Sequence, residues 1–440
     1  MHFAPRTATR DAATLNSMPV LTASSAFSRV TALAAQRPVH AAFAWLHANP
    51  KTIMDWQVGL VSIPAPNHGE RERAEWLAQR FSEVGLSSVG IDAVGNVVGF
   101  LAGEGSHAES DGPVILLSAH IDTVFPAGTP IHPIVDGDRL EAPGASDNGA
   151  GVVGMLALAS ALRHAAAQHP GFELPVPLVF VGNIGEEGEG DLRGVRHLYE
   201  RSGLAGRIAG HVVLDGPGAD AAVTQALGSL RFHVTITGPG GHSFTDAGTP
   251  NPIAALALAL AVLAETALPE EPRTTLNIGT IRGGISVNSI PESAEASVDF
   301  RSTDPDELLR LEVALHRAVE DAVGHWNEKT RELGGSRPRL AFTISKIGDR
   351  PAAQLPNDSP ILATLRAVDR HLGLRSELRL GSTDANIPLA LGVPALSMGA
   401  GGEGGAAHTL HEWYSARERD LGLKRVLLLT LAMLDWAAEQ

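Results

Sequence analysis

Residues 182–190, GNIGEEGEG, place two adjacent glutamates in a glycine-rich segment directly after the apolar run LPVPLVFV. The apolar run predicts a buried strand, so Glu186 and Glu187 would stand at the end of that strand. Neighbouring carboxylates repel each other and are costly to remove from water. A solvated loop would account for one such pair. A cation that needs carboxylate ligands would account for it as well.

Four other segments contain histidine or aspartate residues that could also bind a cation. LLSAHIDTVF carries His120 and Asp122, which share one face of a strand because they are two residues apart. APGASDNGAG offers Asp147, VVLDGPG offers Asp215, and GAAHTLHEWY offers His408. Ligands of an open α/β sheet gather outside the carboxyl ends of its strands, so we expect these side chains to lie together.

Each residue alone has an ordinary explanation. A histidine at a strand end can be a hydrogen-bonded core group, an aspartate before a helix is often an N-cap, and LDG can be a simple turn. Taken together these explanations fail, because clustered carboxylates would repel one another without cations. Two imidazoles and three carboxylates suit two zinc ions, with manganese or cobalt as alternatives, and the chain has no cysteine.

The segments HID, ASDNGAG, GEEGEG, LDG, GPGGHS, VNSIP, DFR and AHTLHEW follow one another in an order that resembles the M20 family of metallopeptidases. The resemblance covers about residues 50–435. It implies that Asp147 bridges two divalent ions. His120 and Asp215 would complete the protein ligands of one ion, and Glu187 and His408 those of the other.

The resemblance also implies roles around the ions. Asp122 would orient the histidine ligand two residues before it, and Glu186 would be the general base that takes a proton from the attacking water. His242, in GPGGHSF, would stabilise the oxyanion, often in the active site of the partner subunit. A cis peptide bond is expected after Asp147.

Substrate contacts are expected from two parts of the chain. By the same resemblance, Asn288 in VNSIP and Arg301 in DFRS would hold polar groups of the substrate, although a surface ion pair would also explain the arginine. The segment GSTDANIP resembles a loop of the peptidase T and dipeptidase members. Its Thr383, Asp384 and Asn386 are therefore expected to line the substrate pocket.

Composition narrows the class of protein. A chain of 440 residues with 44% hydrophobic residues suits a soluble protein of two domains. Its uninterrupted apolar runs are shorter than the roughly 18–20 residues of a membrane span. The formal charge of −15 disfavours nucleic acid and anionic membranes as partners. The lack of cysteine is compatible with a cytoplasmic location, which we expect.

The alternation of apolar runs with helical segments predicts an α/β fold with a largely parallel sheet. We expect residues 1–37 to form a disordered or loosely helical extension and residues 38–228 the first part of the catalytic domain. Residues 229–348 read as β-α-β-β-α-β, a split βαβ (ferredoxin-like) domain inserted as a lid and dimerisation domain. Residues 349–440 would complete the catalytic domain.

The first helix of the inserted domain, PIAALALALAVLAETAL, is apolar nearly all round. A helix that covers one side of a sheet needs only one apolar stripe. A second subunit would bury the remaining face, so we expect a homodimer through this domain. Exposure of a helix rich in alanine is the alternative.

These features predict a di-metal hydrolase of short peptides, of aminopeptidase or dipeptidase type. Asp215 favours that type, because deacylating and carboxypeptidase members tend to carry glutamate there. An amidohydrolase of N-acyl amino acids is the alternative enzyme. A metal-free binding homologue is a third possibility, against which every expected ligand position is occupied.

Overall fold

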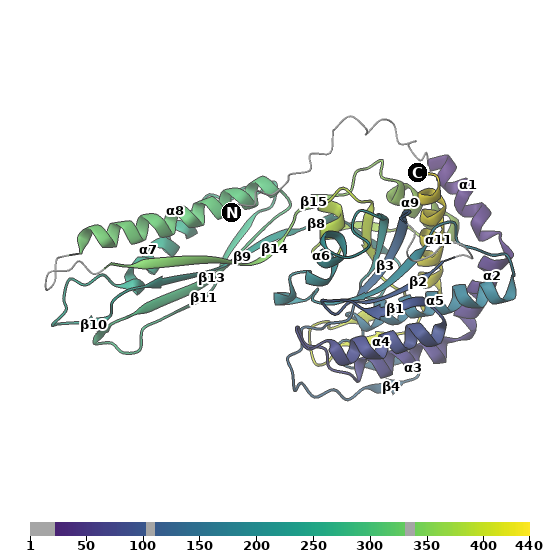
Figure 1. Cartoon of the computed structure of the whole chain (residues 1–440), viewed down its shortest axis with the longest axis horizontal. Coiled ribbons are helices and arrows are strands. Elements are labelled where there is room, and N and C mark those ends of the chain that lie inside the picture. Colours follow the sequence, from purple (N-terminus) through teal and green to yellow (C-terminus); the bar gives the residue numbers. More distant parts are fainter. Residues whose placement is uncertain (1–22, 103–110, 331–338) are drawn as a thin grey trace, which may run out of the picture.

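The computed structural model describes residues 23–102, 111–330 and 339–440. It has a broad large domain, formed before residue 228 and after residue 350, and a narrow inserted domain that extends away from it (Figure 1). The helices of the large domain are α1 (Ala23–Ala34), α2 (Arg37–Ala48), α3 (Pro50–Val61), α4 (Arg71–Val84), α5 (Gly149–Gln168), α6 (Arg193–Glu200), α9 (Pro360–Leu372), α10 (Asn386–Ala390) and α11 (Arg419–Ala438).

A nine-stranded sheet forms the centre of the large domain. Its order is β1-β2-β6-β3-β7-β17-β8-β15, and β16 pairs with β8. The central strands β6, β3, β7 and β17 are parallel neighbours, which confirms the predicted largely parallel α/β sheet. The strands are β1 (Ser87–Ile91), β2 (Val97–Leu101), β3 (Val114–His120), β6 (Leu178–Asn183), β7 (Ile208–Leu214), β8 (Ala221–Ala226), β15 (Ala353–Gln354), β16 (Glu377–Gly381) and β17 (Ala395–Met398).

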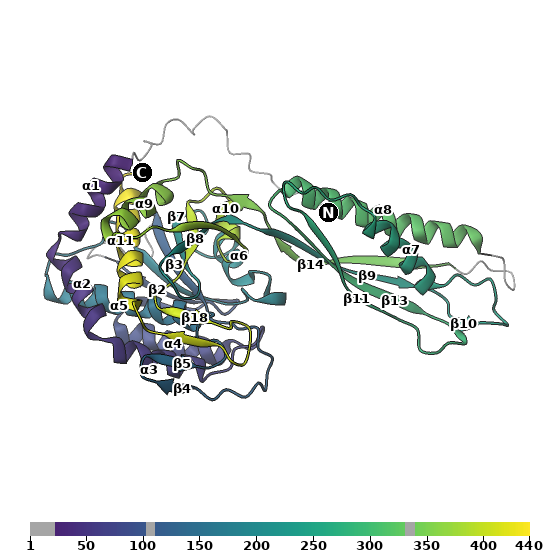
Figure 2. The same cartoon turned by 180° about the vertical axis from the view of Figure 1, so that it is seen from behind.

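Helices cover both faces of this sheet, because its central strands direct apolar side chains toward both faces. Ile115 and Leu117 of β3 belong to the core that includes α5 and α11. Val114 and Leu116, which point the opposite way, pack with Val195 of α6 in a second core. Figure 2 shows α1, α2, α9 and α11 at the end of the large domain that is remote from the inserted domain.

The N-terminal segment differs from the sequence prediction. We expected residues 1–37 to be disordered or loosely helical, but residues 23–34 form the docked helix α1, and residues 1–22 lie outside the described part of the chain. Ala26, Val30 and Leu33 are buried in the main core, where α1 contacts α9 and α11. Their spacing of four and three residues places them on one helical face, and burial of this apolar stripe stabilises the docked helix.

Helix α5 is long and apolar enough to cross a membrane by length and composition alone, which we did not expect from the sequence. In this structure 72% of its most apolar window is buried. It contacts α2, α3 and α4 as well as the sheet. These contacts are those of the core helix of a folded domain.

The inserted domain has the predicted β-α-β-β-α-β order. Its four strands pair antiparallel in the order β11-β13-β9-β14, and helices α7 and α8 pack together on the sheet (Figure 1). A two-stranded ribbon, β10 with β12, lies at the far end of the domain. The elements are β9 (Gly228–Thr237), β10 (Gly241–His242), α7 (Pro252–Ala264), β11 (Thr275–Gly283), β12 (Ser289–Ile290), β13 (Ser293–Ser302), α8 (Pro305–Lys329) and β14 (Ala341–Arg350).

A small second sheet of the large domain was not predicted. Its order is β18-β19-β5-β4, and its loop between β18 and β19 carries His408. This sheet joins the C-terminal part of the chain to the segment just before Asp147. Its strands are β4 (Ile134–Asp136), β5 (Arg139–Glu141), β18 (Glu403–Gly405) and β19 (Trp413–Ser415).

The chain passes between the two domains twice, once before β9 and once after β14. Asn386 joins the two crossings, because its Nδ2 donates to the carbonyl oxygens of Leu227 at 2.9 Å and Pro351 at 3.0 Å. Its Oδ1 accepts from the Thr383 N–H at 2.9 Å. The side chain of Asn386 is therefore a structural link between the crossings.

Candidate metal centre

Three predicted ligands meet at the carboxyl ends of β3 and β7 and the start of α5. His120 is the last residue of β3, Asp147 precedes α5, and Asp215 directly follows β7. His120 Nε2 lies 3.1 Å from Asp147 Oδ1 and 3.8 Å from Asp215 Oδ1. This proximity follows from the parallel pairing of the strands, which brings their carboxyl ends to one edge.

The other two predicted ligands approach the opposite oxygen of Asp147. His408 Nε2 lies 2.9 Å from Asp147 Oδ2 and 3.2 Å from Glu187 Oε1. Each of the two sets, one with His120 and Asp215 and the other with Glu187 and His408, has potential ligand atoms within 4.8 Å of one another. Asp147 belongs to both sets. The structure thus brings all five predicted metal ligands together around a shared carboxylate.

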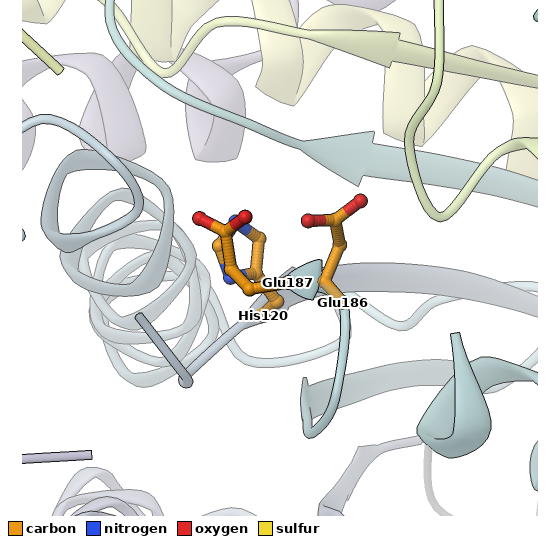
Figure 3. A group of neighbouring side chains, drawn as sticks. All are labelled: His120, Glu186 and Glu187. Atoms are coloured by element: carbon orange, nitrogen blue, oxygen red, sulfur yellow. The ribbon is translucent and has the colours of Figure 1, made fainter. Parts of the chain in front are cut away.

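The adjacent glutamates have different partners. Figure 3 shows Glu187 beside His120 and the carboxylate of Glu186 next to them, and these three residues have potential ligand atoms within 4.8 Å of one another. Oε1 of Glu186 accepts a hydrogen bond of 3.1 Å from Nη1 of Arg350, and Arg350 Nη2 donates to the Glu186 carbonyl oxygen. Arg350 is buried at the end of β14. The sequence analysis missed it, because a lone arginine at a strand end carries no local signature.

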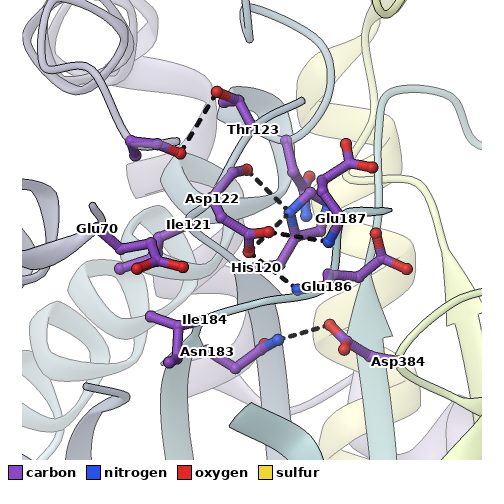
Figure 4. A network of polar contacts seen from close by, with 12 residues as sticks. Glu70, His120, Ile121, Asp122, Thr123, Asn183, Ile184, Glu186, Glu187 and Asp384 are labelled. Carbon is purple, nitrogen blue, oxygen red and sulfur yellow. Dashed lines mark hydrogen bonds and ion pairs between the residues drawn. The ribbon is translucent and has the colours of Figure 1, made fainter. Parts of the chain in front are cut away.

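Asp122 fixes both the histidine and the glutamate loop. Its carboxylate accepts hydrogen bonds from the backbone N–H groups of Glu186 at 3.1 Å and Glu187 at 2.8 Å (Figure 4). His120 Nδ1 lies 3.1 Å from the Asp122 carbonyl oxygen and 3.7 Å from its carboxylate. The predicted orienting residue therefore acts on His120 mainly through its main chain.

The first glycine of GEEGEG, Gly185, is required by the local backbone conformation. This residue adopts φ of +66°, and an added Cβ would lie 2.1 Å from Arg193 Nη1. Only glycine fits such a turn against a neighbouring side chain. The turn directs the chain from the end of β6 into the segment that holds both glutamates.

The backbone around Asp147 is held from the β7 side by Asn148. Asn148 Nδ2 donates to the Leu214 carbonyl oxygen at 2.8 Å, and its Oδ1 accepts from the Gly216 N–H at 3.0 Å. The peptide bond between Asp147 and Asn148 is cis, as the family resemblance implied. These contacts tie the loop of Asp147 to the loop of Asp215.

Electrostatics indicate an excess of negative charge at this point. Burial raises the pKa of Glu187 to about 7 and the pKa of Glu186 well above its ordinary value. The hydrogen bond with Asp147 raises the pKa of His408 to about 9. Burial disfavours the charged form of His120, but its carboxylate neighbours outweigh this and raise its pKa. Burial likewise opposes ionisation of Asp147, yet both histidines lower its pKa.

The donor set fits divalent cations. Oxygen and imidazole ligands without thiolates suit zinc, and manganese or cobalt accept the same ligands. Among the described residues, Glu187 Oε1 is a buried side-chain atom that makes no hydrogen bond, and its charged neighbour is His408 Nε2 at 3.2 Å. A buried carboxylate oxygen without a hydrogen bond is costly unless a cation satisfies it. The residues present therefore match the two ions that the sequence predicts.

Beneath the centre lies a buried arginine that the sequence did not reveal. Arg73 donates to the carbonyl oxygens of Ile63 and Ile121, at 3.0 Å and 2.9 Å. Burial lowers its pKa to about 10, against the opposing effect of Asp122 and Glu412. Its positive charge offsets part of the negative charge of those carboxylates.

Two predicted residues lie far from the centre within one chain. His242 is in β10 and Asn288 directly precedes β12, at the far end of the inserted domain (Figure 1). The Asn288 carbonyl oxygen accepts from Ser243 N at 3.1 Å, so the two predicted residues share one exposed ribbon. Arg301 lies on β13 and pairs with Asp299 at 2.8 Å, the ion pair that was the alternative to substrate binding.

The three residues of GSTDANIP separate in the structure. Thr383 lines a cavity beside Asp215. Asp384 is fully buried and accepts a hydrogen bond of 2.7 Å from Asn183 Nδ2 (Figure 4). Asn386 was expected to line the substrate pocket, but its amide is instead hydrogen-bonded to the two domain crossings. Buried polar groups need internal partners, and that need decides where both side chains point.

The cavity beside Asp215 measures about 240 Å³. It lies between the carboxyl ends of β17 and β16 and the start of β8. Apolar and polar residues both line it. They include Asp220, Ala222, Val223, Arg379, Thr383, Ser397 and Met398.

The fold and the site together define a two-domain α/β hydrolase whose ligand residues could hold two metal ions. The chain belongs to peptidase family M20/M25/M40, whose model matches residues 116–433, and this confirms the resemblance seen in the sequence. The protein YqjE of Bacillus subtilis is 23% identical over 408 residues, which cover 89% of this chain and all of that protein. A probable carboxypeptidase of Ajellomyces dermatitidis is 33% identical over 232 residues, covering 48% of this chain and 51% of the relative.

Solved structures share the fold over nearly the whole chain. Aminopeptidase PepT of Bacillus cereus has a TM-score of 0.66 at 19% identity, covering 87% of this chain and 98% of its own. Bacillus subtilis YXEP, described as a dinuclear metal binding peptidase, has a TM-score of 0.60 at 18% identity, covering 88% and 99%. The aminobenzoyl-glutamate utilization protein of Klebsiella pneumoniae has a TM-score of 0.63 at 16% identity, covering 88% and 97%.

Proposed function

We propose that this hydrolase cleaves amide bonds of short peptides, as an aminopeptidase or dipeptidase that holds two zinc ions. The observation that carries the proposal is the pair of ligand sets that share Asp147. Glu186 lies beside them, with potential ligand atoms within 4.8 Å of His120 and Glu187, but its carboxylate is hydrogen-bonded to Arg350. Asp215 stands where deacylating members of the family tend to carry glutamate. The similar structures include an aminopeptidase.

The residues would divide the work as follows. His120 and Asp215 would hold one ion, and Glu187 and His408 the other, with Asp147 between them. When bound, such ions lower the pKa of water and polarise the substrate carbonyl group. Glu186 would take the proton of the attacking water and deliver it to the leaving amine.

Arg350 would keep the proton-accepting glutamate in place. Its guanidinium contacts both the carboxylate and the carbonyl oxygen of Glu186. Burial disfavours the charged form of Glu186, which makes it a stronger base once it is ionised. Asp122 holds the backbone of the same loop and so limits its movement.

We also propose that two chains associate through the inserted domain. Ile253, Leu258 and Val262 of α7 are exposed, which leaves an apolar face uncovered in one chain. A second copy would cover it, and large exposed apolar patches mark such interfaces. His242 and Asn288 lie too far out to serve their own centre in this arrangement, so the partner's centre is the one they would complete.

An N-acyl-amino-acid amidohydrolase is the second candidate. Arg379 lines the cavity beside Asp215 and would suit the carboxylate of such a substrate. Its guanidinium already contacts Glu377 at 2.7 Å, which weakens the case for it. Short peptides therefore remain the first choice.

A substrate panel on protein of known metal content tests the proposal. The full-length chain, stripped by a chelator and reloaded with zinc, manganese or cobalt, is assayed on dipeptides, tripeptides, N-blocked dipeptides and N-acyl amino acids. We expect free di- or tripeptides to be cleaved, chelation to abolish this, and added metal to restore it. Cleavage confined to N-acyl amino acids would select the second candidate. Cleavage confined to N-blocked dipeptides would indicate a carboxypeptidase.

A further inference from the structure

One buried carboxylate holds the turn that presents Asp147. Glu412 Oε1 accepts hydrogen bonds from Ser146 N at 2.7 Å, Ser146 Oγ at 2.8 Å and Asp147 N at 2.7 Å. Its Oε2 accepts from Gly144 N at 2.9 Å. The side chain is wholly enclosed, with 0% of Glu412 exposed. Four donors from one short turn therefore converge on a single residue.

Glu412 also belongs to the loop that carries His408. Its own N–H donates to the Thr409 carbonyl oxygen at 3.2 Å, which closes the turn after the histidine. Its carbonyl oxygen accepts from Ala142 N at 3.0 Å, next to the turn of Asp147. The residue thus connects two loops that lie far apart in the sequence, because Glu412 and Asp147 are 265 positions apart. These are the two loops whose ligands meet at 2.9 Å.

The two sides of Asp147 are held by different residues. Asn148 fixes the loop against the end of β7, through Leu214 and Gly216. Glu412 fixes it against the small sheet that carries His408. The carboxylate of Asp147 projects between these attachments, where each of its oxygens meets one histidine.

We propose that Glu412 is a positioning residue of the metal centre, which holds Asp147 and His408 in their ligand geometry before the ions bind. The inference rests on the two-ion centre proposed above. Groups that orient metal ligands raise affinity, because the loops need less ordering when the ion arrives. Glu412 touches neither substrate nor ions in this scheme and acts through Asp147 and its loop.

The arrangement requires a carboxylate. A glutamine has one oxygen and an NH₂ group, so one end of the side chain would face backbone N–H donors. At least one buried N–H would lose its partner, which is costly. An aspartate keeps the charge, but it is one methylene shorter and cannot reach both Gly144 and Asp147 without a shift of the loop.

Metal titration of full-length variants tests the inference. Glu412→Gln and Glu412→Asp are compared with Ser146→Ala, which removes one hydrogen bond to the same carboxylate and leaves the backbone donors. Asp369→Asn is the control for general stability, because Asp369 is a buried carboxylate that pairs with Arg425 at 2.7 Å on helices without ligands. Calorimetric titration with Zn²⁺ gives affinity and stoichiometry, and the absorption spectrum with Co²⁺ reports ligand geometry.

Wild-type protein is expected to bind two ions, and both Glu412 variants to bind them about 10- to 100-fold more weakly, with an altered Co²⁺ spectrum. Ser146→Ala should change affinity only slightly. Asp369→Asn should melt earlier but bind metal as the wild type does. A folded Glu412→Gln with wild-type affinity and spectrum would overturn the inference, as would an equal loss of affinity in Asp369→Asn. If neither Glu412 variant folds, the residue is a general structural one and the inference also fails. Wild-type protein that binds no ion would refute the two-ion centre itself.

Discussion

Arg350 Nη1 lies 3.1 Å from Glu186 Oε1, whereas Oε1 of the next residue, Glu187, lies 3.2 Å from His408 Nε2. Glu187 has extended backbone angles, with φ of −76° and ψ of 141°. Successive side chains of an extended segment point in opposite directions. Two chemically identical neighbours are thereby given different partners and different roles.

The different partners lead to the first prediction. Glu186→Gln should keep both ions but lose turnover by at least about 100-fold, because it removes the base and no ligand. Glu187→Gln should lose metal itself. Metal content by elemental analysis and kcat on the best peptide substrate distinguish the two effects. Equal loss of metal from both folded variants would contradict the division of roles.

The distance of His242 from its own centre leads to the second prediction. Glu186→Gln and His242→Ala chains should each be inactive alone, but a mixture that exchanges subunits should recover activity. In a heterodimer, one of the two centres combines an intact Glu186 with an intact His242. Activity after mixing is followed together with subunit exchange and the oligomeric state. A monomer, or exchange without recovery, would mean that each chain completes its own site.

The third prediction concerns acid stability. His211 is buried between Ser118 Oγ at 2.8 Å and Tyr199 OH at 3.1 Å, and burial lowers its pKa to about 3. The unfolded chain has the ordinary histidine pKa of about 6.5. Below that pH only the unfolded state gains the proton, so stability is lost as pH falls from about 6.5 toward 3. At pH 5 the loss from this residue is about 2 kcal/mol.

Urea denaturation at pH 7.5 and pH 5 of the wild type and His211→Gln checks this linkage. The variant should be less stable at pH 7.5, because its partners lose a well-placed acceptor or donor. It should also lose less stability between the two pH values. All other residues are the same in both proteins, so the difference between the two isolates His211. Parallel pH dependence of both proteins would show that the residue is not kept neutral.

The cavity beside Asp215 provides the fourth prediction. Val223 lines it and is part of β8, where its side chain is only half-buried. Val223→Phe should fill part of the cavity and raise KM for peptides with large side chains, while peptides of glycine or alanine keep their KM. The change in the ratio of kcat/KM between the two substrate groups is the measurement. A uniform change for all peptides would show that no substrate side chain enters there.

The sequence predicted the ligand positions because His120, Glu187 and Asp215 follow apolar runs and because the motifs around all five ligands resemble those of the family. The carboxyl ends of predicted strands indicated a common sheet edge, and the resemblance implied how the five residues divide between two ions. Arg350 and Glu412 could not, because their roles depend on tertiary contacts across 164 and 265 residues of sequence. A lone arginine has no local pattern that distinguishes it from a surface residue. Glu412 lies in the segment AHTLHEW, but the segment alone does not indicate which backbone donors its carboxylate binds.

Two further differences have the same origin. Asn386 lies in a motif that suggested a substrate contact, yet its amide donates to carbonyl groups of the domain crossings. No local sequence pattern reveals these hydrogen bonds. The docking of helix α1 on the core was not predicted, because its short apolar stripe is diluted by serine and threonine in the composition of the first forty residues. The cytoplasmic location and the absence of nucleic-acid and membrane partners stay predictions.

The link that Asn386 makes between Leu227 and Pro351 has a consequence for how this architecture changes over time. The chain leaves the large domain and returns to it within reach of one amide group. The inserted domain is therefore attached beside the glutamate loop, where Arg231 also donates to the Gly188 carbonyl oxygen at 2.8 Å and Arg350 contacts Glu186. Insertions or deletions at its far end should leave the metal ligands in place, whereas exchange of the whole domain would remove contacts that hold this loop.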